Sequence, residues 1–321
     1  MERVQNGIDK GFEFRARYLN TLAGERGGDP FHVLGMDWAS DTPMLHIRRL
    51  KEDRGLLYYD GGVRPLDLTT LKRVDITSSS DLYCVGRTEE GHVPCPGREV
   101  AEGYAQCMEC LTQDVPDPSC IFEPHCDKGT CGAFFCQVPH IVYVAVYGRR
   151  MKIGMTQLSR VRERGMEQGA DVILPLVIVK DRYSARALEG WISNRYRAPE
   201  ALSGQIVLKA MVRRTAPDIS AGIAVSFMER LRKDQVVMTD ICKGRGIEMG
   251  TLPREMPVEP IVLGPYPIPE RLEALPRFMP VDVISGEAVG FKGKWMVTRE
   301  GTLAAFKMPD LVGRLVLFKD R

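Results

Sequence analysis

The sequence predicts an α+β protein with a compact mixed core, a cysteine-rich segment before it and small β elements at both ends. Three observations predict this fold. Residues 141–200 alternate as strand, strand, helix, strand, helix. Eight of the nine cysteines lie between residues 84 and 136, and short strand-like runs with Gly turns flank both regions. We therefore expect helices and sheets in separate blocks around more than one hydrophobic core.

These patterns divide the chain into five segments. They are a β element with a mobile lead-in (1–83), the cysteine-rich segment (84–140), the mixed core domain (141–215), a helix with a Pro-rich connector (216–280) and a C-terminal β domain (281–321).

The N-terminal segment reads as strands after a weakly periodic start. The first ~35 residues include the Gly-rich stretch AGERGGDP and are expected to be partly mobile. From Pro43 to about Thr77, MLHIRRL and RGLLYYD flank a charged turn, and DGG at 60–62 makes a second turn. A small β-sheet is expected here.

The region after the core mixes strands and helices. QIVLKAMV reads as a strand, and ISAGIAVSFMERLRKDQ (219–235) reads as an amphipathic helix. The Pro-rich stretch over 256–281 predicts an extended connector. The tail has short strands with Gly turns, which favour a compact β-barrel or β-meander.

Composition indicates a soluble protein. The chain is 44% hydrophobic and 27% charged, and its net charge of +2 does not by itself indicate a nucleic-acid partner. The N-terminus lacks the apolar stretch of a signal peptide. The longest apolar run, VILPLVIV at 172–179, is far shorter than the ~18 residues of a membrane span. We expect a cytoplasmic protein without membrane contact.

The first cysteine group predicts a tetrahedral metal site. His92 and Cys95 are separated by two residues, as are Cys107 and Cys110. Two such pairs bring four nitrogen or sulfur donors around one ion, as in structural zinc sites. Cys84 is the alternative to His92 for the fourth position.

A second group follows with looser spacing. Its members are Cys120, Cys126, Cys131 and Cys136. Four thiolates suit a second Zn²⁺ or an iron–sulfur cluster, and zinc is favoured because the ferredoxin spacing is missing. The alternatives are buried free thiols or a redox pair at Cys107 and Cys110. A segment with so little apolar periodicity needs metal staples, so we interpret the metals as structural.

The core domain carries chemically suggestive residues in a fixed order. Ile141-Val142-Tyr143 lies in the first strand, Lys152-Ile153-Gly154 lies in the second strand, and Thr156 follows it. Arg162 comes next, in the first helix, and Leu188-Glu189 in the second helix. This order resembles the β-β-α-β-α core of the GIY-YIG nuclease superfamily, with Lys152 in place of the second tyrosine.

The resemblance implies a metal-dependent phosphodiesterase (an endonuclease) acting on DNA or RNA. Glu189 would hold one Mg²⁺ or Mn²⁺, and Arg162 would clamp a phosphate. Tyr143 would orient or deprotonate the attacking water, and Lys152 would contact the phosphate. The residues expected to contact the substrate are Gly154, Thr156 and Arg164.

Other interpretations stay open. Tyr143 alone is consistent with a core aromatic, and Glu189 with an ordinary ion pair to Arg186 three residues earlier. Because Lys152 departs from the superfamily pattern, a non-catalytic, zinc-stabilised nucleic-acid-binding module is the main rival. An iron–sulfur enzyme that modifies RNA is the third possibility. Residues 141–200 hold eleven Lys and Arg against six Asp and Glu, which favours a nucleic-acid partner; no protein partner is indicated.

A wider likeness covers residues 45–200 and 280–320. The cysteine groups are followed by Cys-Gln-Val-Pro-His140, Lys-Ile-Gly-Met-Thr and Glu167-Gln168-Gly169-Ala170, and a Gly290-Phe-Lys-Gly-Lys stretch comes near the end. This order resembles an uncharacterised prokaryotic family that combines a cysteine-rich zinc segment with a GIY-YIG-like domain. It supports the architecture and carries no activity.

Overall fold

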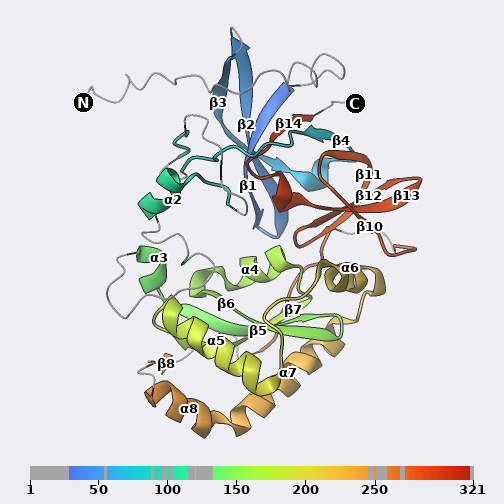
Figure 1. Cartoon of the computed structure of the whole chain (residues 1–321). Coiled ribbons are helices and arrows are strands. Elements are labelled where there is room, and N and C mark those ends of the chain that lie inside the picture. Colours follow the sequence, from blue (N-terminus) through green and yellow to red (C-terminus); the bar gives the residue numbers. More distant parts are fainter. Residues whose placement is uncertain are drawn as a thin grey trace. The chain divides into compact units, whose positions relative to one another are not determined.

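The computed structural model divides the chain into two compact units (Figure 1). The first comprises Met1–Asp114, Pro276–Gly290 and Trp295–Arg321, and the second Val115–Leu275 and Phe291–Lys294. The residues that the structure describes are 29–53, 56–87, 91–95, 100, 104–114, 120, 133–244, 247, 249–250, 259–267 and 272–318. The predicted mobile lead-in lies largely outside this part of the chain. Among the described residues, no helix has the length and apolar character needed to cross a membrane.

The first unit is built on a nine-stranded sheet. Its strands are β1 (Asp29–Ala39), β2 (Thr42–Asp53), β3 (Leu56–Asp67), β4 (Arg73–Ser78), β10 (Arg277–Met279), β11 (Val283–Lys292), β12 (Trp295–Glu300), β13 (Thr302–Lys307) and β14 (Leu315–Phe318). They lie in the order β10-β13-β12-β11-β4-β14-β1-β2-β3. The short helices of this unit are η1 (Leu68–Thr70), α2 (Met108–Asp114) and η4 (Met308–Leu311).

This sheet joins the two ends of the chain. The strands expected between Pro43 and Thr77 are present, and β12 and β13 form the antiparallel hairpin expected of a C-terminal meander. The last strand, β14, pairs with both β4 and β1, so that Val316 lies opposite Ser78 on one side and Phe31 on the other. The sequence analysis placed the N-terminal and C-terminal strands in separate segments. Pairing between strands so far apart in the chain cannot be recognised from a local sequence pattern.

The second unit contains a five-stranded sheet with helices around it. Its elements are α3 (Phe134–Gln137), β5 (His140–Tyr147), β6 (Arg150–Gln157), η3 (Leu158–Arg160), α4 (Val161–Gln168), β7 (Val172–Val179), α5 (Arg182–Tyr196), α6 (Gly204–Arg213), α7 (Pro217–Lys233), α8 (Gln235–Gly244), β8 (Met249–Gly250) and β9 (Ile261–Val262). The strand order is β6-β5-β7-β8, and β9 also pairs with β7. The elements β5, β6, α4, β7 and α5 follow the alternation predicted for residues 141–200.

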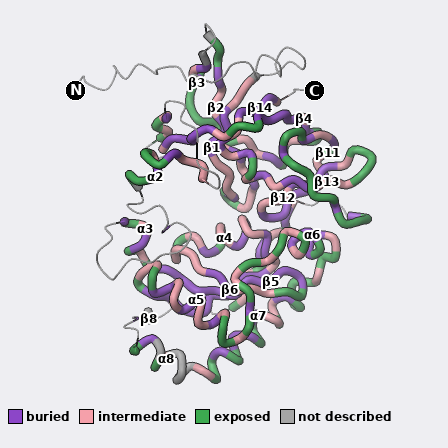
Figure 2. Tube along the Cα trace, viewed as in Figure 1, coloured by how far each residue is buried: buried purple, intermediate pink, exposed green. Residues whose placement is uncertain are grey.

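The two central strands are buried along their whole length. Every residue of β5 and β7 is buried (Figure 2), which explains why both read as continuous apolar runs. On one face, Leu188 of α5 and Phe227 of α7 belong to the same hydrophobic core as Val144. On the other, Gly165 of α4 lies against the side chain of Ile173. Helices on both faces thus fix the position of β5.

One element was predicted wrongly. QIVLKAMV, expected to be a strand, lies within the helix α6. Its buried residues Val207, Leu208 and Met211 recur at helical spacing, whereas Lys209 is exposed. The β-branched residues suggested a strand, but burial of one helical stripe decided the structure. The next helix, predicted over 219–235, is confirmed as α7.

Candidate functional site

The β5–β6 hairpin places Tyr143 directly opposite Gly154. The two residues are antiparallel partners, and Tyr143 also lies opposite Pro175 of β7. The register between β5 and β7 shifts at this point, where Leu176 is passed over. A proline has no amide hydrogen for the ladder, so a bulge beside it is expected. The motif tyrosine therefore sits at an irregular point of the sheet.

The ring of Tyr143 is completely buried. Its hydroxyl donates to Oε1 of Gln168 at 3.3 Å, and the hydroxyl of Tyr147 reaches the same oxygen at 3.3 Å. Burial raises the pKa of Tyr143 to about 12. At neutral pH this tyrosine is a fixed hydrogen-bond donor and a poor proton acceptor.

A cavity of roughly 430 Å³ opens beside this hairpin. Its walls come from α3, β5, β6, η3, α4 and α5, with Glu200 from the loop after α5. Six of the residues predicted from the sequence line it: Tyr143, Lys152, Gly154, Thr156, Arg164 and Glu189. The fold thus gathers at one cavity residues that are up to 46 positions apart in the chain (189 − 143).

The predicted phosphate clamp, Arg162, does not line this cavity. Arg160, Arg164 and Gln168 follow one another at intervals of four on α4 and its preceding turn, and all three line the wall. Positions four apart share one face of a helix, whereas Arg162 is offset from that face and is exposed. Within the cavity, Arg164 replaces Arg162 as the arginine of this helix.

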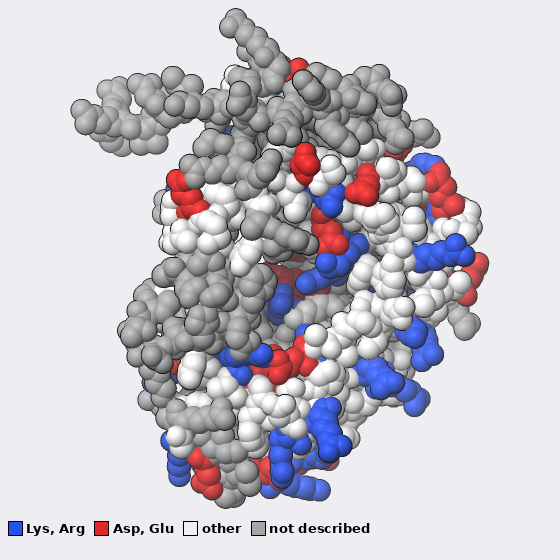
Figure 3. Space-filling view, in the orientation of Figure 1, with Lys and Arg blue, Asp and Glu red and all other residues white. Residues whose placement is uncertain are grey.

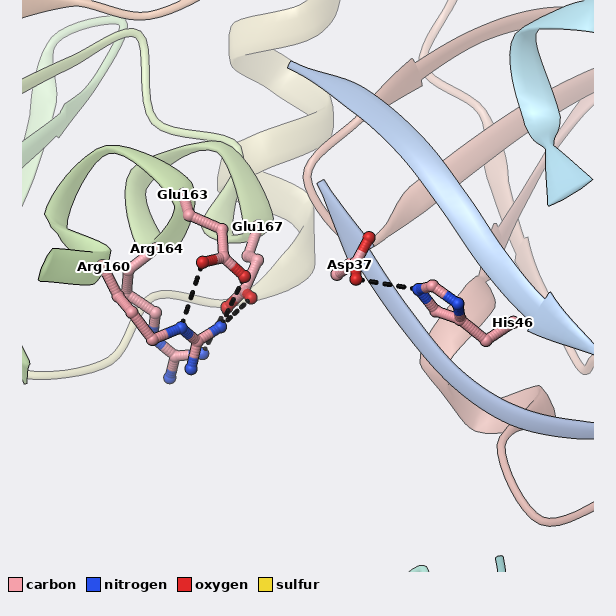
Figure 4. Close-up of polar contacts among 6 residues, drawn as sticks. All are labelled: Asp37, His46, Arg160, Glu163, Arg164 and Glu167. Atoms are coloured by element: carbon pink, nitrogen blue, oxygen red, sulfur yellow. Dashed lines mark hydrogen bonds and ion pairs between the residues drawn. The ribbon is translucent and has the colours of Figure 1, made fainter. Parts of the chain in front are cut away.

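A network of ion pairs holds Arg160, just before α4, and Arg164 of α4 (Figure 4). Arg160 contacts Glu163 with Nη2 at 2.7 Å and Glu167 at 2.6 Å, and Arg164 contacts Glu167 at 2.9 Å. The two carboxylates neutralise part of the charge that the arginines bring to the cavity. They also fix the two guanidinium groups in position before any ligand arrives.

Lys152 is the cation on the strand side of the cavity. Its Nζ donates to the backbone carbonyl of Glu200 at 3.3 Å. Burial, followed by the charge of Arg164, lowers its pKa to about 8, while the carboxylate of Glu189 acts in the opposite direction. Lys152 is therefore still mostly charged at pH 7, yet it can lose its proton within the physiological range.

Glu189 lies at the opposite wall in a chain of charges. Arg182, Arg186 and Glu189 are spaced at four and three residues on α5, so they face the cavity together. Nη1 of Arg186 lies 2.9 Å from Oε2 of Glu189 and 2.5 Å from Oε2 of Glu200. Burial raises the pKa of Glu189, and the hydrogen bond from Arg186 opposes that shift.

Glu189 could contribute one carboxylate oxygen to a divalent cation. Within the part of the chain that the structure describes, its Oε1 accepts no hydrogen bond, so one carboxylate oxygen is available to a ligand. Mg²⁺ needs few protein ligands because it retains several waters. Such a metal would be held by the carboxylate of Glu189, by water molecules and by the molecule bound in the cavity.

Sequence reasoning missed several residues of this cavity. Glu200 and Gln168 gave no chemical signal, since each is a single polar residue near the end of an element. His140 was not among the predicted site residues, yet it lines the wall. Spacing along α5 could have identified Arg182, because it precedes Arg186 by four residues.

The first unit contains a compact cluster of four thiols. Sulfur atoms of Cys84, Cys95, Cys107 and Cys110 all lie within 4.8 Å of one another. The Sγ atoms of Cys95 and Cys107 are 3.8 Å apart. A tetrahedral ion with bonds of about 2.3 Å to sulfur separates its ligands by about 3.8 Å. These four cysteines could therefore bind a metal such as zinc.

The protonation of the cluster also favours a cation. Burial raises the pKa of Cys110, and the neighbouring Cys84 raises it further. Burial of Cys107 opposes its ionisation, but hydrogen bonds from Cys110, Cys84 and Cys95 hold its pKa below the usual value. Backbone amides also donate to Cys84, from Cys107 at 3.1 Å and from Gly86 at 3.4 Å. Without a cation, these thiols cannot all be ionised together.

The fourth position of this cluster belongs to Cys84, and the choice of His92 is corrected. His92 uses Nε2 on the carbonyl of Val85 at 2.8 Å and Nδ1 on Arg48 at 2.9 Å. Both ring nitrogens are thus occupied outside the cluster. His92 lies beside it, with its ring edge against Tyr59 at 5.2 Å between centroids.

The second cysteine group stays a prediction. Cys126 and Cys131 lie outside the described residues, and only Cys120 and Cys136 are placed. Both placed cysteines are buried.

Comparison with known proteins gives one family. The model of a family described as "Protein of unknown function (DUF2797)" matches residues 72–308, which is more than two thirds of the chain. No curated protein and no solved structure shows a significant match.

Proposed function

The chain belongs to the DUF2797 family, and because the family's description names no activity, we propose a function from the geometry of the cavity. The proposal is that the protein acts on nucleic acid as a divalent-metal-dependent phosphodiesterase. The reaction would take place in a GIY-YIG-like domain over residues 141–215.

The convergence of Tyr143, Lys152, Arg164 and Glu189 on one cavity carries this proposal. Phosphodiester hydrolysis requires cations around the scissile phosphate and a metal-binding carboxylate near it. Lys152 and Arg164 supply the cations and Glu189 supplies the carboxylate. Arg164 takes the role that the sequence had given to Arg162.

The likeness to the GIY-YIG core is supported by topology and by one close approach. The order β5, β6, α4, β7, α5 and the central place of β5 in the sheet suit that core. Tyr143 and Gly154 stand at corresponding motif positions and are cross-strand partners. The departure is Lys152, which would contact the phosphate as a point charge.

The proposed metals differ between the units. Glu189 would hold Mg²⁺ or Mn²⁺, which would neutralise phosphate charge and lower the pKa of a bound water. Structural zinc is proposed for the four thiols of the first unit, since their spacing suits a single ion. An iron–sulfur cluster places several iron atoms between its thiolates and so needs a wider spacing.

Nucleic acid is favoured over a small phosphodiester by the local balance of charge. Residues 141–200 carry eleven basic against six acidic residues, a surplus of five. The rest of the chain carries 33 basic (44 − 11) and 36 acidic (42 − 6) residues. Figure 3 shows side chains of both signs on one face of the molecule, with basic ones predominating in its lower part. Attraction to a polyanion would therefore be local to this domain and sensitive to salt.

A second candidate function has its own support. Tyr143 is buried and hydrogen bonded to Gln168, and Lys152 replaces the tyrosine of the second motif. Both features suit a binding module that has kept phosphate contacts and lost hydrolysis. Salt-dependent binding without cleavage in any metal would favour this alternative.

A cleavage assay on labelled DNA and RNA, single- and double-stranded, with Mg²⁺ or Mn²⁺, tests the proposal. Glu189→Gln should abolish cleavage, and Glu229→Gln, which changes an exposed carboxylate of α7 outside the cavity wall, should retain it. Arg164→Met should lower the rate by about 100-fold or more, whereas Arg162→Met should stay close to wild type. Equal activity in wild type and Glu189→Gln would refute the assignment of the site.

A further inference from the structure

The proposed hydrolysis lacks a proton acceptor among the residues predicted from the sequence. Tyr143 donates to Gln168 and holds its own proton tightly. Lys152 donates to the carbonyl of Glu200. Oε2 of Glu189 already accepts from Arg186, and its other oxygen is assigned to the metal. A further group must take the proton from the attacking water.

His140 has the geometry of such an acceptor. It is the first residue of β5, is only 3% exposed and lines the same cavity. Its Nδ1 lies 2.7 Å from the carbonyl oxygen of Val138. A carbonyl oxygen can only accept, so Nδ1 must carry the hydrogen. In the neutral ring, Nε2 then holds a free lone pair.

That lone pair has no partner within the described part of the chain. The single hydrogen bond of the His140 side chain is the one from Nδ1. The hydrogen bond from Nδ1 to the backbone carbonyl of Val138 fixes the tautomer and the orientation of the ring. The imidazole can then accept a proton at Nε2.

Burial, more than the charges around the ring, favours the neutral form of His140. Arg182 and Asp181, at the start of α5, are the charged groups that act on it. Its strand partners Gln157 and Val179 are uncharged. Burial lowers the pKa of His140, and the hydrogen bond to the carbonyl of Val138 opposes that shift. Arg182 lowers the pKa further, and Asp181 raises it.

We propose that His140 is the general base of the cavity, with Nε2 accepting a proton from the water that attacks phosphorus. This inference rests on the phosphodiesterase proposed above. The water oxygen forms a bond to phosphorus as its proton passes to Nε2, and the bond from phosphorus to the leaving oxygen breaks. The leaving oxygen takes a proton from solvent, and the imidazolium returns its proton to solvent. The number of protons on the enzyme is therefore unchanged after one turnover.

The substitution His140→Asn separates this role from a structural one. The asparagine amide nitrogen lies near the position of Nδ1 and retains a donor for Val138, but nothing replaces Nε2. Single-turnover cleavage should fall by about 100-fold or more, with unchanged nucleic-acid binding, and the acid limb of the pH–rate profile should disappear. Imidazole added to His140→Gly should restore part of the rate. The control His46→Asn, in the other unit, should leave cleavage unchanged.

The possible results are distinguishable. If wild type cleaves and His140→Asn stays within threefold with the same pH profile, the general base is refuted while the phosphodiesterase stands. If wild type cleaves nothing, both fall. If His140→Asn loses a stoichiometric zinc, His140 is a metal ligand and not a base. Should the variants fail to fold, nitrogen NMR of wild type decides, because a hydrogen on Nε2 at pH 7 would overturn the proposal.

Discussion

The ring of Tyr143 occupies the space that a side chain at position 154 would need. A Cβ atom built on Gly154 would lie 2.6 Å from Cζ and 2.7 Å from the hydroxyl oxygen of Tyr143. The buried ring of Tyr143 thus requires a glycine at position 154. The pair therefore has a packing reason to occur together, whatever chemistry the cavity performs.

Gly154→Ala should destabilise the second unit. The added methyl group cannot avoid the buried ring, and overpacking of this kind costs about 1–3 kcal/mol in unfolding free energy. Urea denaturation measures the effect. Gly222→Ala is the matched control, because nothing lies within 4 Å of that position on α7. A helical glycine replaced by alanine should instead gain about 0.5–1 kcal/mol. Equal stability of both variants would contradict the packing argument.

Cys84→Ser should lower the metal content of the protein, whereas His92→Ala should leave it unchanged. Cys84 provides one of four clustered thiols, whereas His92 uses both ring nitrogens elsewhere. We expect Cys84→Ser to lose the metal or bind it far more weakly, and His92→Ala to keep the wild-type stoichiometry. Elemental analysis after dialysis against a chelator measures this. If His92→Ala loses the metal and Cys84→Ser keeps it, the fourth ligand is His92 and not Cys84.

The sequence predicted the local features of the fold better than the long-range ones. The runs of β5 and β7 were recognisable because burial on both faces leaves continuous apolar stretches. The pairing of β14 with β4 and β1 was not recognisable, since it depends on partners more than 230 residues away. For α6, β-branched residues on a buried helical stripe imitated a strand.

The candidate site shows the same division. Residues in motif order, such as Tyr143 and Glu189, were predicted and line one cavity. The choice between Arg162 and Arg164 depended on which face of α4 lines the cavity. Two residues that are two positions apart point to nearly opposite faces of a helix. Spacing alone favoured His92 over Cys84, although a thiol eleven residues before Cys95 completes the cluster. Both choices depend on which way a side chain points in the folded protein, and the residue types alone do not determine that.

Breaking the buried ion pair between Lys292 and Asp171 should strongly destabilise the second unit. Lys292 is 3% exposed, its Nζ lies 2.5 Å from Oδ1 of Asp171, and it also faces the ring of Tyr266 at 4.1 Å. Lys292→Met leaves a partly buried carboxylate whose remaining donor, among the residues that the structure describes, is the amide of Gly148. The loss should be about 3–5 kcal/mol, measured by urea denaturation.

Two further variants test the origin of that loss. Adding Asp171→Asn to Lys292→Met removes the unpaired charge and should recover part of the stability. Lys307→Met breaks an exposed pair with Asp310 at a similar distance and should cost less than about 1 kcal/mol. A loss in Lys292→Met no larger than in Lys307→Met would show that burial does not strengthen the first pair.

His32 should make the first unit sensitive to acid. Its ring is fully buried, with Nδ1 2.7 Å from the hydroxyl of Tyr59, and Nε2 has no partner among the described residues. Burial, followed by the charge of His92, lowers the pKa of His32 from 6.5 to about 4. The unfolded chain therefore binds the proton more readily, and stability should fall as the pH drops from about 6.5 to about 4. The full loss is about 3 kcal/mol.

Unfolding free energies at pH 7, 5 and 4 test this for wild type and for His32→Asn. Asparagine keeps a polar partner near Tyr59 but has no group that titrates in this range. Release of metal from the thiols in acid affects both proteins alike, so the difference between them isolates His32. We expect the two curves to converge by about 3 kcal/mol between pH 7 and 4. Parallel curves would show that His32 binds its proton equally well in the folded and unfolded chains.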